Sequence, residues 1–163
     1  MNIATSGDQM LGSVDAKLEE MGIVLPSPPT PIANYVGFVR TGNLLFLSGQ
    51  LCVADGAPVA KGKLGSQVNV EGGQAAARVS AINLLAQVKI ALGDLDKVVR
   101  VVRLGGFISA TPDFLGASTV MNGASDLMVE VFGDKGRHAR SAVTVPVLPA
   151  DAAVEVEAIF EVT

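Results

Sequence analysis

The chain has 163 residues, of which 49% are hydrophobic and only 17% are charged, and its formal net charge is −4. These values fit one folded domain, and they argue against a disordered chain and against nucleic acid as a partner. One cysteine and one histidine exclude an internal disulfide, a cysteine zinc site, a multi-histidine metal site and a Ser-His-Asp hydrolase within one chain.

The surface and the cellular setting are also constrained by composition. So low a charge content indicates that another subunit covers part of the surface. No uncharged apolar run of about 18 residues predicts a transmembrane helix, and the first residues lack the pattern of a secretory signal. The expected setting is the reducing cytoplasm, away from the membrane.

The N-terminal part predicts a short helix. Residues 13–21 carry the helical pattern, with Ser13 as the expected cap and Gly22 as the stop. Residues 22–25 are expected to form a brief strand. The proline-rich residues 27–31 must be extended and cannot lie inside a central strand.

A β-hairpin is predicted next. Residues 35–40 and 44–51 read as strands, and residues 41–43 between them as a tight turn. The second strand is apolar enough to be covered on both faces. Ser48 and Gly49 within it indicate a bulge or a close approach of another chain segment.

The middle of the chain predicts a long helix followed by a long strand. The glycine-rich residues 53–68 read as a loop, and Asn69 is the expected cap of a helix over residues 70–92. Gly93 ends this helix. Residues 96–109 are rich in β-forming residues and contain arginines on alternating faces, which predicts a bulge or an edge strand.

A second helix and two final strands complete the prediction. The helix spans residues 119–132, and residues 138–162 hold two extended apolar runs joined by a proline-rich turn. The order is strand, strand, helix, strand, helix, strand, strand. It predicts an α+β fold, an α/β sandwich in which two main helices cover one face of a mixed sheet and a short N-terminal helix is added.

Arg140 and Glu155 stand in or beside the most strand-like segments. Alternation alone indicates a solvated strand end for Arg140 and the wet side of a half-exposed strand for Glu155. A tight hairpin turning near Ala150 would pair Arg140 with Glu161 and separate Arg140 from Glu155 by about 20 Å. The two could then share a ligand only if a second copy of the chain supplies one of them, or if the hairpin is irregular.

Four other residues have simpler interpretations. Tyr35 is expected as a core or interface ring, and Cys52 as a small buried apolar residue. His138 lies in a glycine-rich and basic loop, where it is expected to be solvated. Asn122 falls within the second helix, where it faces either solvent or a site.

Three motifs stand in the chain in this order: Y-V-x(5)-G-N-L-L-F-L-S-G-Q, A-R-S-A-V-x-V-x-x-L-P and V-E-V-E-A-I. In kind and order they resemble the RidA/YjgF family of imine deaminases, whose members are also named endoribonuclease L-PSP. The resemblance runs from about Leu25 to the end, so residues 25–163 form the family-like core of a single domain and residues 1–24 an extension. It implies a chorismate-mutase-like fold, a homotrimer with clefts between subunits, no cofactor, and hydrolysis of 2-imino or enamine acids to 2-keto acids and ammonia.

The resemblance also implies roles for individual residues. Arg140 corresponds to the arginine that holds the substrate carboxylate, and Glu155 to the acid that orients water. Three residues match other cleft positions of the family: Tyr35, Ser48 and Gly49. Asn122 matches with a spacing to Arg140 that is one residue longer. The sequence departs from the family at Ala142, where cysteine is frequent, and at Cys52, where proline is common.

Two other functions remain open at this level. The same cleft could hold a small carboxylate, such as an imino or keto acid, without turning it over, as a regulatory module does. Ribonuclease activity is disfavoured by the acidic charge and by the lack of a histidine pair.

Overall fold

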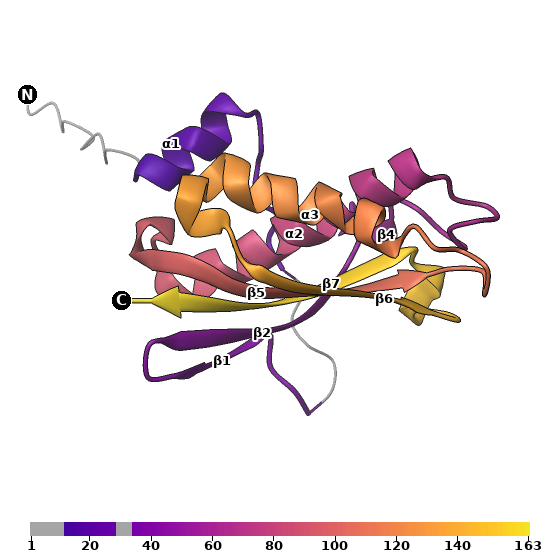
Figure 1. Ribbon diagram of the computed structural model, residues 1–163. Helices are drawn as coiled ribbons and strands as arrows, with labels where there is room; N and C mark the ends of the chain where they lie inside the picture. Colours follow the sequence, from indigo (N-terminus) through magenta and orange to yellow (C-terminus); the bar gives the residue numbers. More distant parts are fainter. Residues whose placement is uncertain (1–11, 29–33) are drawn as a thin grey trace, which may run out of the picture.

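The structure is a computed structural model that describes residues 12–28 and 34–163. A five-stranded sheet with the strand order β1-β2-β7-β5-β6 is covered on one face by α2 and α3, with α1 beside them (Figure 1). The helices are α1 (Ser13–Glu20), α2 (Val70–Leu92) and α3 (Ala117–Phe132). The strands of this sheet are β1 (Phe38–Thr41), β2 (Leu44–Leu51), β5 (Val98–Ser109), β6 (Ala139–Val145) and β7 (Val154–Val162). The predicted α+β sandwich is confirmed.

The final two strands do not form the predicted hairpin. β5 lies between them, antiparallel to β7 and parallel to β6, which makes the sheet mixed. The backbone N–H of Ala110 donates to Val145 (3.1 Å), and that of Ser109 donates to Ala153 (2.9 Å). The end of β5 therefore occupies the position that a tight turn would need, and the link from β6 to β7 crosses over it.

Helix α2 begins and ends as its sequence predicts. The side chain of Asn69 accepts a hydrogen bond from the N–H of Gly72 (2.8 Å), and Gly93 ends the helix with a φ of 73°. By length and composition alone α2 could cross a membrane, but more than half of its most apolar window is buried inside this domain. It is the central helix of the core.

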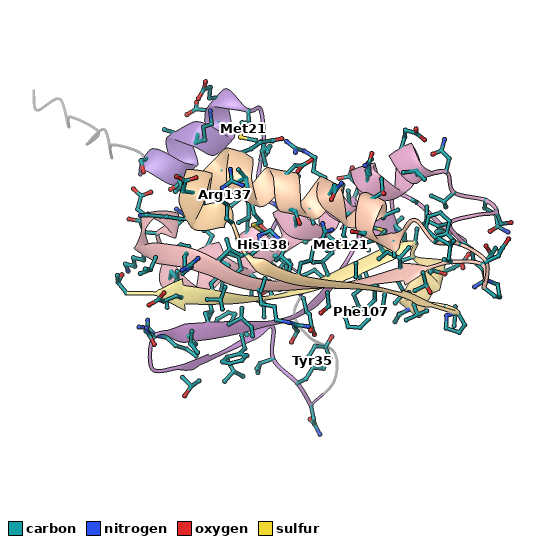
Figure 2. All side chains as sticks on the ribbon, viewed as in Figure 1. Met21, Tyr35, Phe107, Met121, Arg137 and His138 are labelled. Atoms are coloured by element: carbon teal, nitrogen blue, oxygen red, sulfur yellow. The ribbon has the colours of Figure 1, made fainter. Side chains whose placement is uncertain are left out.

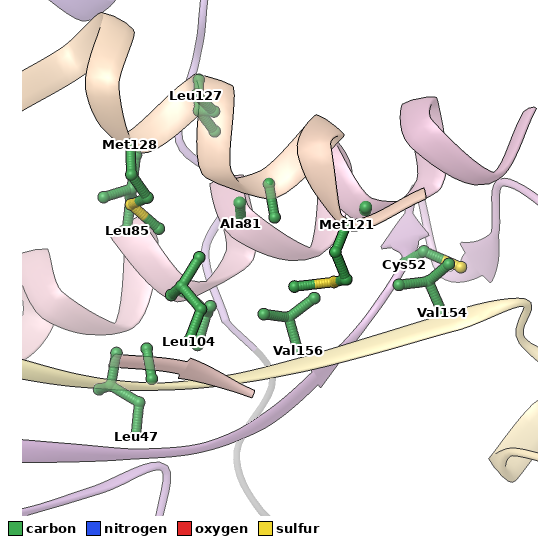
Figure 3. Close-up of a cluster of buried hydrophobic side chains, with 14 of the residues drawn as sticks. Leu47, Cys52, Ala81, Leu85, Leu104, Met121, Leu127, Met128, Val154 and Val156 are labelled. Atoms are coloured by element: carbon green, nitrogen blue, oxygen red, sulfur yellow. The ribbon is translucent and has the colours of Figure 1, made fainter. Parts of the chain in front are cut away.

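The core lies between the two long helices and the sheet (Figure 3). Leu85 of α2 and Met121 and Met128 of α3 gather above Leu104 and Val156 of the sheet, and all five are fully buried. Along β7 the residues alternate, with each valine, Ala158 and Phe160 buried and the glutamates half-buried. The sheet therefore has one covered face and one open face, as the alternation in β7 predicts.

The start of the described chain corrects two expectations. Ser13 does not cap α1, because Gly12 is the cap residue and Ser13 is already helical. The carboxylate of Asp96 accepts from the N–H groups of Ser13 (2.7 Å) and Val14 (2.9 Å), so a residue far along the chain caps this helix. These bonds, with that of Val14 the largest cause, lower the pKa of Asp96. Residues 22–25 form no strand, because the chain after Gly22 packs as an irregular segment.

The hairpin of β1 and β2 is confirmed, with differences in detail. β2 has the predicted bounds, and its register against β7 shifts between Leu47 and Gln50, which is the predicted bulge. The expectation that both faces of β2 are covered is wrong within one chain, because Phe46 is 40% exposed on the open face. The predicted loop over residues 53–68 contains a small hairpin of β3 (Val53–Ala54) and β4 (Ala57–Pro58). Only residues 27 and 28 of the expected extended segment lie within the described chain.

Candidate functional site

The residues singled out in the sequence form two groups. One group surrounds Arg140, on the edge strand β6 beneath α3. The other surrounds Gly49, at the bulge of β2, and includes Tyr35 and Glu155. In Figure 2 His138 lies between α3 and the sheet, whereas Tyr35 lies beyond the sheet, on the side away from the helices.

Arg140 is held by side chains and backbone of α3. Its Nη1 donates to Oδ1 of Asn122 (3.0 Å) and to Oγ of Ser125 (3.2 Å). Its Nη2 donates to the carbonyl (3.2 Å) and the hydroxyl (2.7 Å) of Ser118. All these acceptors are neutral, so they fix the plane of the guanidinium without cancelling its charge. These bonds use four of the five guanidinium N–H groups, so an anion that approaches this edge meets an uncancelled positive charge and must replace some of the neutral acceptors to pair with the fork.

His138 supports this arrangement from behind, and the expectation that it is solvated is wrong. Its Nδ1 lies 2.6 Å from the carbonyl of Gly136, and because a carbonyl only accepts, Nδ1 carries the proton. Nε2 is then the acceptor for the hydroxyl of Ser125, 2.9 Å away. Ser125 therefore donates to His138 and presents its lone pairs to Arg140.

Electrostatics keeps His138 neutral. Burial is the main cause that lowers its pKa below the ordinary histidine value, and the charge of Arg140 lowers it further, against the opposite effect of the bond to Gly136. A neutral imidazole is the form that the hydrogen bond from Ser125 requires. The sequence of contacts from Gly136 to His138, Ser125 and Arg140 is therefore self-consistent.

Glu155 lies on the open face of the sheet, next to Gly49. A β-carbon built on Gly49 would collide with Oε1 of Glu155. Glycine at the bulge thus leaves the space that the carboxylate occupies, which explains a residue that would otherwise weaken a strand. The sequence predicted such a close approach at Gly49 without showing which residue makes it.

The environment of Glu155 favours its protonated form. Burial raises the pKa of the Glu155 carboxyl above its ordinary value, and the charge of Glu157 raises it further. Glu157, two residues after Glu155 on β7, forms an ion pair with Arg103 (3.1 Å). A carboxylate with a raised pKa is a stronger base than an ordinary glutamate, which suits it to accept and return a proton.

Ser48 and Tyr35 complete the second group. The hydroxyl of Ser48 donates to the carbonyl of Val36 (2.6 Å), and its N–H donates to the carbonyl of Gly37 (2.9 Å). These bonds tie the segment that carries Tyr35 to the bulge. The ring of Tyr35 is exposed and lines a groove beside Gly49, so of its two predicted places the core is wrong and the interface stays a prediction.

The two groups cannot hold one small ligand within a single chain. Arg140 is paired in register with the buried Leu104 and so lies on the covered face of the sheet, whereas Glu155 is paired with Phe107 on the open face. β5 also separates their strands. A shared site therefore needs two copies of the chain, which is one of the two possibilities that the sequence left open.

Sequence reasoning missed Ser118 and Ser125, and it assigned His138 to solvent. Ser118, Asn122 and Ser125 are spaced by four and three residues, which places them on one face of α3. This polar stripe was visible in the sequence and pointed to a polar partner beneath the helix. In the part of the chain that the structure describes, no three acidic, histidine or cysteine side chains gather as metal ligands.

Comparison with known proteins agrees with this architecture. Residues 15–162 match the family model described as "YjgF/chorismate_mutase-like, putative endoribonuclease". Protein TCP17 of Trypanosoma cruzi is 49% identical over 151 residues, which cover 92% of this chain and 94% of that protein.

Two solved structures extend the comparison. Atu1372 of Agrobacterium tumefaciens, a protein of unknown function, is 45% identical and superposes with a TM-score of 0.87 over 93% of each chain. TdcF of Escherichia coli, solved with bound serine, is 26% identical with a TM-score of 0.58 over 84% of this chain and 94% of TdcF.

The mixed sheet with its helical layer defines a chorismate-mutase-like α+β domain. The chain belongs to the YjgF family, in which the RidA proteins are also found.

Proposed function

We propose that this protein hydrolyses reactive 2-imino or enamine acids to 2-keto acids and ammonia. The observation that carries the proposal is the pair of prepared groups, the guanidinium of Arg140 held by neutral acceptors and the carboxyl of Glu155 with a raised pKa. Arg140 binds the substrate carboxylate, and Glu155 acts on water. No cofactor is needed, because an iminium carbon is already electrophilic.

The reaction requires few groups. Glu155 takes a proton from water as the oxygen attacks the iminium carbon, and the C=N double bond becomes a C–N single bond. Glu155 then returns the proton to the amine nitrogen, the C–N bond breaks to release ammonia, and the remaining hydroxyl passes its proton through Glu155 to that ammonia as the ketone forms. One water is consumed, and one ammonium ion leaves for each keto acid. Positioning and one general base supply the acceleration.

The site is proposed to be completed in a homotrimer. Val39 (55% exposed) and Val143 (48% exposed) lie with Phe46 on the open face of the sheet. An apolar, uncovered sheet face supports burial against further copies of the chain. A ring of three copies would bring the β6 edge of one subunit to the open face of the next and so place Arg140 opposite Glu155.

A second candidate is a module that binds a small carboxylate without turnover. The bound serine of TdcF favours it, because that relative holds a small molecule with a carboxylate and an amino group. The prepared cation at Arg140 would serve both functions. A ribonuclease, as the description of the family model suggests, fits the net charge of −4 less well.

The test is the release of ammonia and keto acid from freshly generated 2-imino acids, with wild type beside Arg140→Ala. The proposal predicts acceleration by the wild type that is lost in the variant. Binding of keto acids without any acceleration would support the non-catalytic module instead. If the variant is as fast as the wild type, the role given to Arg140 is wrong.

A further inference from the structure

A groove of about 760 Å³ opens beside Gly49, along the stretch of β2 that β1 does not pair. Tyr35 and Gly49 form one end of it, next to the carboxylate of Glu155. Asn83 and Gln87 of α2 line its inner wall. Gly49 therefore borders both the groove and the carboxylate of Glu155, which makes the groove a neighbour of the candidate site.

Gln87 is the most unusual residue of the groove. Only 7% of it is exposed, and a β-carbon on Gly37 would approach its Oε1 to 2.5 Å. Glycine at position 37 thus leaves space for this carboxamide against the chain. Gln87 lines the groove, and its amide is not one of the buried polar groups that lack a partner; among the described residues those are the hydroxyls of Ser80 and Ser109. A polar group of a ligand in the groove can hydrogen-bond to this amide.

The neighbouring amides present oxygens to the same space. Asn83 uses its Nδ2 to donate to the carbonyls of Leu51 (3.0 Å) and Val53 (2.9 Å). Gln50 uses its Nε2 to donate to the carbonyls of Ser48 (3.0 Å) and Gly49 (3.3 Å). Both side chains are fixed by these bonds, and each keeps an amide oxygen that can accept from a ligand.

We propose that the groove is the specificity subsite for the substrate side chain, and that it selects imino acids whose side chain ends in a neutral hydrogen-bonding group, above all a carboxamide. The inference rests on the proposed function. The NH₂ of a ligand amide donates to the oxygens of Asn83 and Gln50, and its carbonyl accepts from Gln87.

Other side chains fit less well. An apolar substrate side chain would cover the amide of Gln87 without giving it a hydrogen-bond partner. A binding site built to hydrogen-bond its substrate rejects a substrate that lacks the bonding group strongly, whereas an apolar pocket rejects an added hydroxyl only weakly. A carboxylate side chain would face the oxygens of Asn83 and Gln50, and Asp55 also lines the groove. Discrimination therefore works against both apolar and acidic substrates.

The test compares two imines of similar shape, those of asparagine and leucine, one ending in a carboxamide and the other in an isopropyl group. We expect wild type to favour the asparagine imine by roughly tenfold in kcat/KM, since one buried hydrogen bond is worth about 1–1.5 kcal/mol. Gln87→Leu should lower that ratio about tenfold. Gln74→Leu is the matched control, because Gln74 lies on the same helix but bonds to Thr119 of α3, and it should keep the wild-type ratio.

A wild-type ratio near one, or a ratio that Gln87→Leu leaves unchanged, overturns the inference. Failure of the proposed function has a different signature, namely that no imine is turned over. Binding to the subsite is then measured by NMR. Propionamide is the probe, and the chemical shifts of the side-chain NH₂ groups of Gln50 and Asn83 are followed. Shifts of these signals in wild type that are lost in Gln87→Leu support the subsite, and their absence at saturating propionamide contradicts it.

Discussion

The β6 edge and the β2 bulge carry different halves of the proposed chemistry and are built in different ways. At the β6 edge, four acceptor atoms of α3 fix the charged side chain of Arg140, and His138 orients one of them, the hydroxyl of Ser125. At the β2 bulge, glycine leaves the space, and a carboxylate from β7 fills it. Hydrogen bonds position Arg140, whereas the missing side chain of Gly49 makes room for Glu155.

The difference shows what each half must do. A carboxylate clamp works only when its fork is oriented before the ligand arrives, so its cost is met by packing it against α3. A proton acceptor instead needs a dry position with a raised pKa and room for substrate, and a bulge with glycine supplies the room. Either half alone is incomplete, which is why the two are expected to meet across subunits.

The largest expected effect is the loss of the fork at the β6 edge. Arg140→Lys keeps the charge but cannot make two parallel hydrogen bonds, and kcat/KM for imino acids should fall on the order of 100-fold. Size-exclusion chromatography should show the oligomer unchanged. Full activity in this variant would mean that the charge alone, and not the planar fork, binds the carboxylate.

The next effect is expected at the β2 bulge. Gly49→Ala should displace the carboxylate of Glu155 and lower kcat/KM by roughly 10- to 100-fold, because a shift of about 1 Å at a catalytic group is enough. Gly105→Ala is the matched control, since its β-carbon would lie 2.7 Å from Oε1 of Glu157 instead. We expect a much smaller loss of kcat/KM in Gly105→Ala than in Gly49→Ala. Equal losses would assign the effect to the sheet as a whole.

A smaller effect is expected behind Arg140. Ser125→Ala removes one acceptor, and His138→Ala removes the group that orients it, so each should raise KM about three- to fivefold with kcat near wild type. The double variant should be no worse than Ser125→Ala, because the two residues act through one contact. Steady-state kinetics of all three variants decides this. Additive losses would show that His138 acts independently of Ser125.

The smallest effect is a shift in pH dependence at Glu155. Its base form is the active one, so kcat/KM falls as the pH drops through its raised pKa, and this limb should lie above the pH expected of an ordinary glutamate. Glu157→Gln removes the like charge and should move the limb to lower pH, while burial keeps part of the shift. Glu161→Gln, on the same strand and face beside Asn43, should leave the limb in place. If the acidic limb stays in place in Glu157→Gln, the charge of Glu157 does not raise the pKa of the group that controls activity.

The elements of the fold were largely predictable, and their order in the sheet was not. Asn69 and Gly93 mark α2 through local hydrogen bonds and a local backbone angle, which a sequence shows directly. The pairing of β6 with β5 depends on contacts between distant segments. Proline-rich residues between two strands suggested a hairpin, but local pattern cannot show that another strand is inserted there.

The site was predictable in the same uneven way. Motif resemblance pointed to Arg140 and Asn122, and the structure places their side chains 3.0 Å apart despite the unusual spacing. His138 was misjudged because its loop is polar, and its burial depends on the packing of α3 against β6. Gln87 gave no signal, since a glutamine on a long helix is ordinary until the groove beside it is known.

The most direct test of the shared site is complementation between two inactive variants. Arg140→Ala and Glu155→Gln are unfolded together in equal amounts, refolded and assayed with an imino acid, beside each variant refolded alone. In a ring where each cleft takes Arg140 from one subunit and Glu155 from the next, about one quarter of the clefts regain both residues. Recovery near one quarter of the wild-type rate is the predicted result. No recovery, while each variant refolded with wild type keeps about half of the activity, would show that the two residues do not meet across subunits.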